Sequence, residues 1–379
     1  MPVWIADNAA FAGFCREASA VGAVAVDTEF DWTSTFYPRL ALLQMATSPE
    51  HCALVDVFCI TDTQEFRGVL ENPQVVKYFH EAASDLPLLR RWTDGALPAN
   101  IFDTRIAGGF CGLGQTCSLK SLFAQLLNLN IAKTETRSNW LQRPLTEQQK
   151  QYAVEDVARM PELAARLRER VEACGNLPRF EEEMLHFSCP ETYREELPEN
   201  YWHRIGGRGN IKPADLAVLK ELARWRELTA RELNLTRNRV LADKQMLDIL
   251  NLRLATLNDL YRIPNYYPKQ VKRFGEGIVA AINQGRKYTP AQLEEFRQLP
   301  LPQDFTASVN RVLGLARKRC ASQQIDPLLV CPRRRAEHLV MAVSQGKLKP
   351  DDAFFQTWRG TLLGPALKSI LFDNKATHR

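Results

Sequence analysis

Residues 23–30 read Ala-Val-Ala-Val-Asp-Thr-Glu-Phe, an apolar run that ends in two carboxylates one residue apart. The valines and small alanines predict a buried β-strand. Because side chains alternate between the two faces of a strand, Asp27 and Glu29 point to the same side at its end. Two anions this close repel each other, and a hard divalent cation beside them would keep both ionised at neutral pH. The stretch therefore predicts either a metal site or a strand that simply ends in polar residues at the surface.

A second carboxylate-bearing segment follows another predicted strand, at residues 75–80. Asp85 comes just after this strand, at the start of a helical face, and α/β sheets place functional groups at such positions. The alternative is an Asp in the first helical turn that only stabilises the helix. Asp85 is thus a candidate third ligand.

A third segment is the helix predicted over residues 151–170, which the capping-box pattern of Thr146 and Gln149 starts. Tyr152 and Asp156 lie four residues apart on it and therefore share one face. A phenol and a carboxylate so placed can hold a metal and a water together. A half-buried tyrosine beside an exposed Asp would show the same spacing.

The other elements predicted before residue 130 alternate between helix and strand. We expect helices at residues 7–20, 63–70 and 118–127, and strands at 39–47 and 52–58. The short turn at residues 48–51 favours an antiparallel pair. Residues 101–107 could be a short strand or a helix start. This pattern predicts an α/β domain over residues 1–170 with a mixed sheet.

Length and composition place the chain among globular proteins of two or three domains, with 379 residues, 45% hydrophobic and 25% charged. The nine cysteines include no Cys-x-x-Cys pair, so a zinc site or a disulfide framework is not expected. No long uncharged apolar run occurs, and the first residues lack the basic and apolar regions of a signal peptide. We therefore predict a cytoplasmic protein without a membrane segment.

The charge is divided unevenly along the chain. Residues 1–200 contain 18 Lys and Arg against 28 Asp and Glu, whereas residues 201–379 contain 31 against 16. This division predicts an acidic, metal-using part joined to a part that meets a polyanion such as nucleic acid. The basic clusters at residues 317–319 and 333–335 are candidates for that contact, or ordinary solvated helix faces.

The second half of the chain predicts small helical domains. Residues 171–207 have the composition of a partly helical linker. Two segments of similar length and plan follow, at residues 208–290 and 291–379, each with too few apolar residues for a large enzyme core. We expect two small all-α bundles.

Taken together, the motifs resemble the ribonuclease D family, in the DEDD superfamily of 3′→5′ exonucleases. The resemblance rests on residues 27–30 (Asp-Thr-Glu-Phe), 79–85, 138–146 and 152–156. The tyrosine at 152 matches the subclass named for it. Asn139 stands where the family often has Asp, outside the proposed metal ligands. Residues 219–282 resemble the helicase-and-ribonuclease-D C-terminal (HRDC) module, and 305–371 a second, more divergent copy.

The resemblance implies an RNase H-like α/β exonuclease domain followed by the two helical domains. Asp27, Glu29, Asp85 and Asp156 would bind two divalent ions, Mg²⁺ or Mn²⁺. Such ions activate the attacking water and stabilise the leaving 3′ oxygen, while Tyr152 would orient the water. The implied product is a nucleoside 5′-monophosphate. The implied partner is RNA, chiefly tRNA precursors with 3′ extensions, with no obligate protein partner.

Substrate contacts and activity leave alternatives open. Phe30 could stack on terminal bases or pack in the core, and Gln44 and His80 could touch the substrate backbone. A DNA 3′→5′ exonuclease would use the same metal chemistry. A non-catalytic RNA-binding scaffold is the other alternative, although the presence of all four carboxylates and the tyrosine argues against it.

Overall fold

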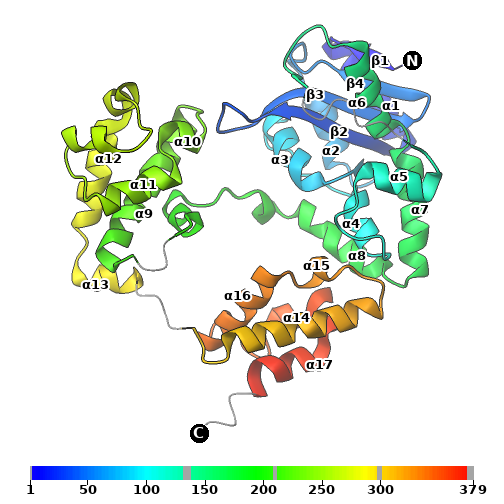
Figure 1. Cartoon of the computed structure of the whole chain (residues 1–379). Helices are drawn as coiled ribbons and strands as arrows, with labels where there is room; N and C mark the ends of the chain where they lie inside the picture. Colours follow the sequence, from blue (N-terminus) through cyan, green and yellow to red (C-terminus); the bar gives the residue numbers. More distant parts are fainter. Residues whose placement is uncertain (1, 131–137, 208–210, 297–300, 374–379) are drawn as a thin grey trace. The chain divides into compact units, whose positions relative to one another are not determined.

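The computed structural model describes residues 2–130, 138–207, 211–296 and 301–373, and the chain forms two compact units (Figure 1). We call Met1–Phe30, Leu40–Tyr193 and Leu301–Arg379 the sheet unit, and Asp31–Arg39 with Arg194–Pro300 the helical unit. No helix in the described ranges is long and apolar enough to span a membrane.

A six-stranded sheet in the order β1-β4-β3-β2-β5-β6 is the centre of the sheet unit. β3 and β4 are antiparallel, as the short turn predicts, while β1 with β4, β2 with β5, and β5 with β6 are parallel. The sheet is therefore mixed. Its strands are β1 (Val3–Ile5), β2 (Ala23–Asp31), β3 (Arg39–Ser48), β4 (His51–Val55), β5 (Val76–Phe79) and β6 (Ile101–Asp103).

The two faces of β2 pack differently, as the alternation of its side chains requires. Val24 and Val26 belong to the main apolar core, together with residues of α1 (Asn8–Val21), α2 (Gln64–Glu71) and α3 (Ala82–Trp92). Ala25 belongs to a smaller cluster with Val157 of α6 (Glu147–Ala158). Asp27 and Glu29 continue the Ala25 side of the strand, so they belong to the side of the sheet that α6 covers.

The helix predicted over residues 151–170 is two helices. The capping box starts α6 as expected, because Gln149 N donates to Thr146 Oγ1 at 3.1 Å and Thr146 N donates to Gln149 Oε1 at 2.9 Å. The chain leaves helical geometry at Arg159 (φ −102°, ψ 5°), and α7 (Met160–Ala173) follows. Pro161 follows the break by two residues, in the first turn of α7; in one continuous helix it could not donate an N–H to the Val157 carbonyl, and its ring would clash there.

Shorter helices complete the first part of the sheet unit. They are α4 (Thr104–Gly109), α5 (Leu119–Leu127), α8 (Leu177–Met184) and the 3-10 turns η1 (Leu185–Ser188) and η2 (Pro190–Tyr193). Asp103 caps α4, since its carboxylate accepts from the backbone N–H groups of Arg105 and Ile106 at 2.8 and 3.1 Å. This cap fixes where α4 leaves β6.

The C-terminal helices share one apolar core with the sheet. These are α14 (Phe305–Ala321), α15 (Pro327–Val330), α16 (Arg333–Ser344), the turn η6 (Ala353–Gln356) and α17 (Trp358–Phe372). The Trp358 ring lies 5.1 Å from Phe110, and its Nε1 donates to Glu183 Oε2 at 2.9 Å. A Cβ on Gly109 would lie 2.5 Å from Leu329 Cδ1, so glycine permits this close approach. The sequence predicts a separate domain at residues 291–379; the structure groups residues 301–379 with the sheet, and the domain boundaries stay predictions.

The helical unit packs around α9 and α12. Its elements are η3 (Pro198–Arg204), α9 (Pro213–Glu232), α10 (Arg237–Val240), α11 (Asp243–Asn251), η4 (Asn258–Arg262), α12 (Pro268–Arg286), α13 (Pro290–Leu293) and η5 (Glu294–Phe296). A Cβ on Gly285 would lie 2.4 Å from Val218 Cα, so α9 and α12 can approach this closely only with glycine there.

Residues 31–39, the connection between β2 and β3, belong to the helical unit. The Arg237 guanidinium lies 4.6 Å from the Phe36 ring, and Tyr37 N donates to Asn234 Oδ1 at 3.1 Å. Arg237 is itself held by the fully buried carboxylate of Glu227, with Nη2 to Oε1 at 2.8 Å. A buried ion pair of this kind keeps the arginine in one position.

Replacing Trp358 tests whether the C-terminal helices stabilise the sheet. We expect Trp358→Ala to lower the free energy of unfolding of the sheet unit by about 3–5 kcal/mol, because it leaves a cavity beside Phe110 and an unpaired Glu183 oxygen. Urea unfolding measures the loss. Leu328→Ala, at a side chain of α15 that is 51% exposed, is the control and should change stability by less than about 0.5 kcal/mol. Similar losses for both variants would contradict the shared core.

Candidate active site

Three carboxylates meet where β2 ends beneath α6. One oxygen each from Asp27, Glu29 and Asp156 lies within 4.8 Å of the others. The first two come from one side of β2, and the third comes from the last turn of α6. An all-oxygen donor set of this kind suits a hard divalent cation.

Asp85 belongs to the same cluster. It lies in the first turn of α3, its side chain is buried, and the Thr28 hydroxyl donates a short hydrogen bond to its carboxylate. Repulsion from Asp85 acts on both Asp27 and Glu29. Three of the four carboxylates that the sequence singled out thus meet at one place, and Asp85 lies near enough for its charge to act on two of them, although it is not one of the three whose oxygens lie within 4.8 Å of one another.

Burial and mutual repulsion raise the proton affinity of these carboxylates. Burial, and then the charges of Asp85, Asp156 and Glu29, raise the pKa of Asp27 well above its ordinary value. Burial, and then the charges of Asp156 and Asp85, raise the pKa of Glu29 to about 9. Burial raises the pKa of Asp85 to about 7, against the lowering effect of the Thr28 hydrogen bond. Burial and like charges thus both disfavour the ionised forms of Asp27 and Glu29, and a divalent cation would compensate both effects.

Tyr152 lies one turn before Asp156 on α6, and its ring packs against Trp140 with the ring centroids 6.0 Å apart. Burial, followed by the negative charges of Asp156 and Glu29, raises its pKa above the ordinary value near 10. Tyr152 therefore stays protonated at neutral pH. A neutral phenol positions a water through hydrogen bonds and does not remove its proton.

The cluster opens into a pocket of about 450 Å³. Besides Asp27, Glu29, Tyr152 and Asp156, the residues that line it are Thr28, His80, Glu81, Arg105, Thr116, Cys117, Ser118, Leu119 and Lys120. Two of these side chains, Arg105 and Lys120, are cationic. They give the pocket groups that can meet a phosphate next to groups that can hold a cation.

His80 lines the pocket in a defined tautomer. Thr104 Oγ1 donates its one hydrogen to the Phe79 carbonyl at 3.0 Å, so at 2.9 Å from His80 Nδ1 it can only accept. Nδ1 of His80 therefore carries a proton. The contact with Thr104 restricts the orientation of the His80 ring. A contact between His80 and the substrate stays a prediction.

Gln44 does not lie where a substrate contact would place it. The sequence predicts a possible contact with the substrate backbone, but the side chain is fully buried in β3 and is absent from the lining of the pocket. Its two amide atoms have no hydrogen-bond partner among the described residues. Phe30, also a predicted contact, does not line the described pocket either.

The sequence did not single out Arg105, Lys120 or Arg143. Arg105 forms an ion pair with Glu81, which adopts a left-handed conformation (φ 77°) at the start of α3. Arg143 lies in the 138–146 motif and is structural. Its Nε and Nη2 donate to the two oxygens of Asp56 at 2.9 and 3.0 Å, which fastens the segment before α6 to the sheet. Nothing local in the sequence marks these three arginine and lysine side chains among many others.

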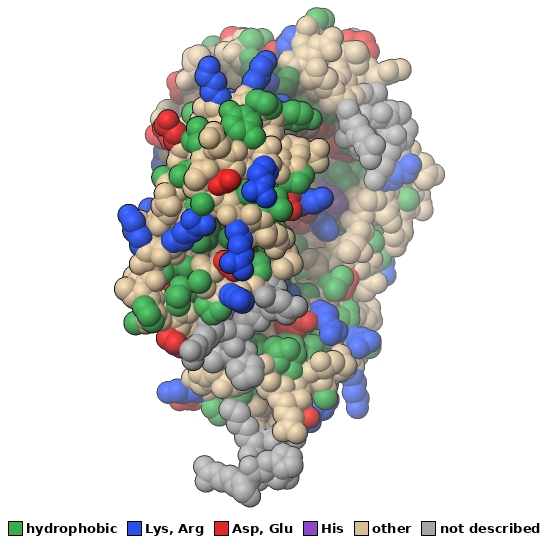
Figure 2. Space-filling model, turned by 60° about the vertical axis from the view of Figure 1, so that its left-hand side comes forward, with side chains coloured by type: hydrophobic (Ala, Val, Ile, Leu, Met, Phe, Trp, Pro, Cys, Tyr) green, Lys and Arg blue, Asp and Glu red, His purple; other side chains and the backbone are tan. Residues whose placement is uncertain are grey.

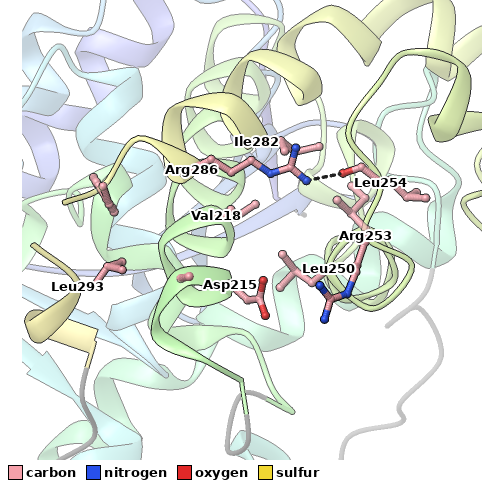
Figure 3. A pocket seen from close by; sticks show the side chains of 12 residues that line it. Asp215, Val218, Leu250, Arg253, Leu254, Ile282, Arg286 and Leu293 are labelled. Carbon is pink, nitrogen blue, oxygen red and sulfur yellow. Dashed lines mark hydrogen bonds between the residues drawn. The ribbon is translucent and has the colours of Figure 1, made fainter. Parts of the chain in front are cut away.

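A second pocket, of about 330 Å³, lies in the helical unit (Figure 3). Its wall is mainly apolar, with Val218, Leu250 and Ile282, and Arg286 donates to the Leu254 carbonyl at 3.4 Å. Asp215 is the one acidic side chain among its described lining residues. It therefore lacks the group of carboxylates that a divalent metal site requires.

Gln44→Leu separates a structural from a substrate-binding role. Because both amide atoms are buried without partners, we expect the apolar replacement to leave stability unchanged or to raise it by about 1–2 kcal/mol. Thermal unfolding measures this, and exonuclease assays should give an unchanged KM. A KM that rises several-fold while stability holds would restore Gln44 as a substrate contact.

Comparisons with known proteins identify the family of the chain. The chain matches the family of 3′-5′ exonuclease domains at residues 2–172 and the HRDC domain at residues 215–282. It is 31% identical to a ribonuclease D of Pseudomonas paraeruginosa and 29% identical to that of Escherichia coli K12, in each case over 97% of both chains. The crystal structure of E. coli RNase D, described as an exoribonuclease involved in structured RNA processing, matches with a TM-score of 0.86 and 27% identity, covering 98% of this chain and 99% of that one. The resemblance and the predicted mixed α/β fold with a helical C-terminal part are confirmed: the chain belongs to the ribonuclease D family.

Proposed function

We propose that this 3′→5′ exoribonuclease shortens RNA from its 3′ end by two-metal catalysis, releases nucleoside 5′-monophosphates and acts on tRNA precursors with 3′ extensions. Family membership makes the chain an exoribonuclease that uses divalent metal ions. The observation that supports this mechanism most directly is the meeting of Asp27, Glu29 and Asp156 oxygens within 4.8 Å at the floor of an open pocket. Cytoplasmic location and the lack of an obligate protein partner stay predictions.

Asp27, Glu29, Asp85 and Asp156 would hold two divalent ions, with Mg²⁺ and Mn²⁺ as the candidates. The donor set supports these ions because it consists of carboxylates, and because the charges of neighbouring carboxylates raise the pKa values of Asp27 and Glu29. Bound divalent ions supply water activation and neutralise the charge that develops in phosphodiester hydrolysis.

Tyr152 would be a positioning group for the attacking water. Its phenol is protonated at neutral pH, and its ring packs against Trp140, which restricts the orientation of the phenol before substrate arrives. A phenol in a fixed place lowers the entropic cost of aligning the water with the phosphorus atom.

Arg105 and Lys120 would bind the phosphates of the terminal nucleotides. Both line the pocket that contains the carboxylates. Cations in this place attract a polyanion that the acidic floor alone would repel until the metal ions are bound. His80 would add a contact to the sugar or phosphate, and Phe30 a contact to a base.

DNA hydrolysis remains the competing activity, because the metal chemistry does not involve the 2′-hydroxyl. Family membership favours RNA. Matched single-stranded RNA and DNA oligonucleotides of one sequence, digested side by side and resolved nucleotide by nucleotide, decide between them. Faster digestion of DNA would contradict the proposed substrate.

The first functional prediction concerns the carboxylates. We expect Asp27→Asn and Asp156→Asn each to lower kcat for 3′ trimming by at least about 100-fold, because each removes a metal ligand. RNA affinity measured by fluorescence anisotropy should remain nearly unchanged. Glu155→Gln is the matched control: its side chain neighbours Asp156 on α6 but accepts from Gln151, and activity should hold. Unchanged trimming in either aspartate variant would reject the site.

The second functional prediction concerns metal and stability. Because the folded-state pKa values of Glu29 and Asp85 are raised, the metal-free protein loses free energy of unfolding as pH rises from about 4 towards 7–9. At pH 8 we expect Mn²⁺ at about 100 times its Kd to raise the Tm of the wild type by about 3–5 °C. Asp27→Asn should be at least as stable as the wild type in EDTA and gain much less from Mn²⁺. An equal gain in both proteins would place the metal elsewhere.

A further inference from the structure

The loop between α4 and α5, residues 110–118, leads into the lining of the catalytic pocket and is held by the C-terminal helices. Residues 116–120 line the pocket. Gln115, directly before them, is held through both of its backbone groups. Its N–H donates to Asp326 Oδ2 at 2.7 Å, and its carbonyl accepts from Arg105 Nε at 2.8 Å. Gln115 thus connects the C-terminal helices to a cation of the pocket.

Asp326 has a defined position at the start of α15. It is the N-cap of this helix, where its Oδ1 accepts from Leu328 N at 2.8 Å, and its own N–H donates to the Gly109 carbonyl at 2.7 Å. Arg335, from a basic cluster that the sequence singled out, donates to the Val330 carbonyl at 2.8 Å and so holds the other end of α15. The second oxygen of the Asp326 carboxylate therefore reaches Gln115 from a fixed place.

A further contact holds the same loop at its start. The side chain of Asn176 is fully buried, and its Nδ2 donates to the carbonyls of Phe110 and Gln323 at 2.9 and 2.7 Å. Near the other end, Gly114 adopts φ 89° directly before Gln115, a left-handed conformation that favours glycine. The loop is therefore held at two places, and both contacts involve the segment that precedes α15.

Position distinguishes Arg105 from the many other cations of the chain. Figure 2 shows Lys and Arg side chains spread over one face of the molecule. Arg105 belongs to α4, and it lines the catalytic pocket. Its guanidinium donates to Gln115 through Nε and forms an ion pair with Glu81, so two groups set its orientation. Because a guanidinium has five N–H donors, these two contacts leave donors for a phosphate oxygen.

We propose that Asp326 is a positioning residue of the active site: it holds Gln115, and the Gln115 carbonyl orients Arg105 toward a phosphate of the RNA. Asp326 is absent from the lining of the described pocket, so it acts through two hydrogen bonds in series. An arginine with fixed partners loses less conformational freedom when it binds a phosphate, because its side chain is already ordered in the folded protein. The inference rests on the proposed function, in which Arg105 binds a phosphate of the terminal nucleotides.

Asp326→Ser separates positioning from helix capping. Serine caps helices about as well as aspartate, so α15 keeps its cap, but one hydroxyl oxygen cannot occupy the positions of both carboxylate oxygens. For a single-stranded RNA oligonucleotide, we expect KM to rise by about 3- to 10-fold and kcat to change by less than about 2-fold, because a contact made equally in the ground and transition states is weakened. Initial rates of mononucleotide release measure both constants.

Asp352→Ser is the matched control. Asp352 is also a half-buried N-cap of the C-terminal helices, where its Oδ1 accepts from Phe354 N at 2.9 Å. It does not line the described pocket, so the same chemical change there should leave KM at the wild-type value. An equal rise of KM in both serine variants would show a general effect on the C-terminal helices and would overturn the positioning role.

A double-mutant cycle tests the route through Arg105. Arg105→Gln alone should raise KM by about 10-fold or more, because it removes a charged contact with the phosphate. Adding Asp326→Ser should then raise KM by less than about 2-fold, because the group that Asp326 positions is already gone. Fully additive effects on KM, or a wild-type KM in Arg105→Gln, would contradict the route.

Two measurements show whether the change stays local. Circular dichroism and thermal unfolding report whether Asp326→Ser is folded, and Mn²⁺ should raise its Tm as much as that of the wild type because the carboxylates are untouched. A lost Mn²⁺ effect would mean that the whole pocket is disturbed and would overturn the inference. Asp326→Asn has one acceptor oxygen for two N–H groups. It is the second variant if serine does not fold there, and KM should rise in the same direction.

Activity of the wild type separates this inference from the proposed function. If the wild type releases no mononucleotides from any RNA, the proposed function fails, and the inference that rests on it fails as well. If the wild type releases them while both Asp326 variants keep its KM, the inference alone fails. A fall in kcat at an unchanged KM would also count against the positioning of a phosphate contact.

Discussion

Repulsion among four carboxylates, of which Asp85 is buried and the other three are half-buried, is the constraint on which the site depends. Asp27, Glu29, Asp85 and Asp156 are held close together where burial disfavours their charged forms, and their own charges oppose one another. Such an arrangement is unfavourable unless protons or divalent cations compensate it. The rest of the sheet unit has to hold these groups in place against that repulsion. It does so with a rigid strand, a capped helix and hydrogen bonds from neighbouring side chains.

The supports are distributed over segments far apart in the chain. The Thr28 hydroxyl orients Asp85 across 57 residues, and Arg143 fastens the segment before α6 to Asp56. The capping box then starts α6 at a defined place, so that Tyr152 and Asp156 arrive over β2. Each contact is local in space, and together they fix an active site with little freedom. A fixed site of this kind reduces the reorganisation needed when substrate binds.

The two units combine different chemistry. The sheet unit concentrates negative charge in a pocket, with Arg105 and Lys120 beside it. The helical unit exposes cations and tyrosines around α12. It also includes residues 31–39, the connection between β2 and β3. Exposed cations and a group of close carboxylates thus reside in separate parts of one chain. Salt should affect the first more than the second, because screening weakens exposed charges more than buried ones.

The sequence by itself determined the local patterns. Alternation along residues 23–30 placed Asp27 and Glu29 on one side of a strand, and the four-residue spacing placed Tyr152 and Asp156 on one face of a helix. Both placements depend only on the repeat of the strand or helix backbone. The family resemblance then predicted that these residues and Asp85 form one site. Tertiary structure alone decided that Gln44 is buried, that Arg105 and Lys120 line the pocket, and that α6 and α7 are separate helices. It also joined the C-terminal helices to the sheet through Trp358 and Phe110. These outcomes depend on which distant segments pack together, and packing between distant segments leaves no periodic trace in the sequence.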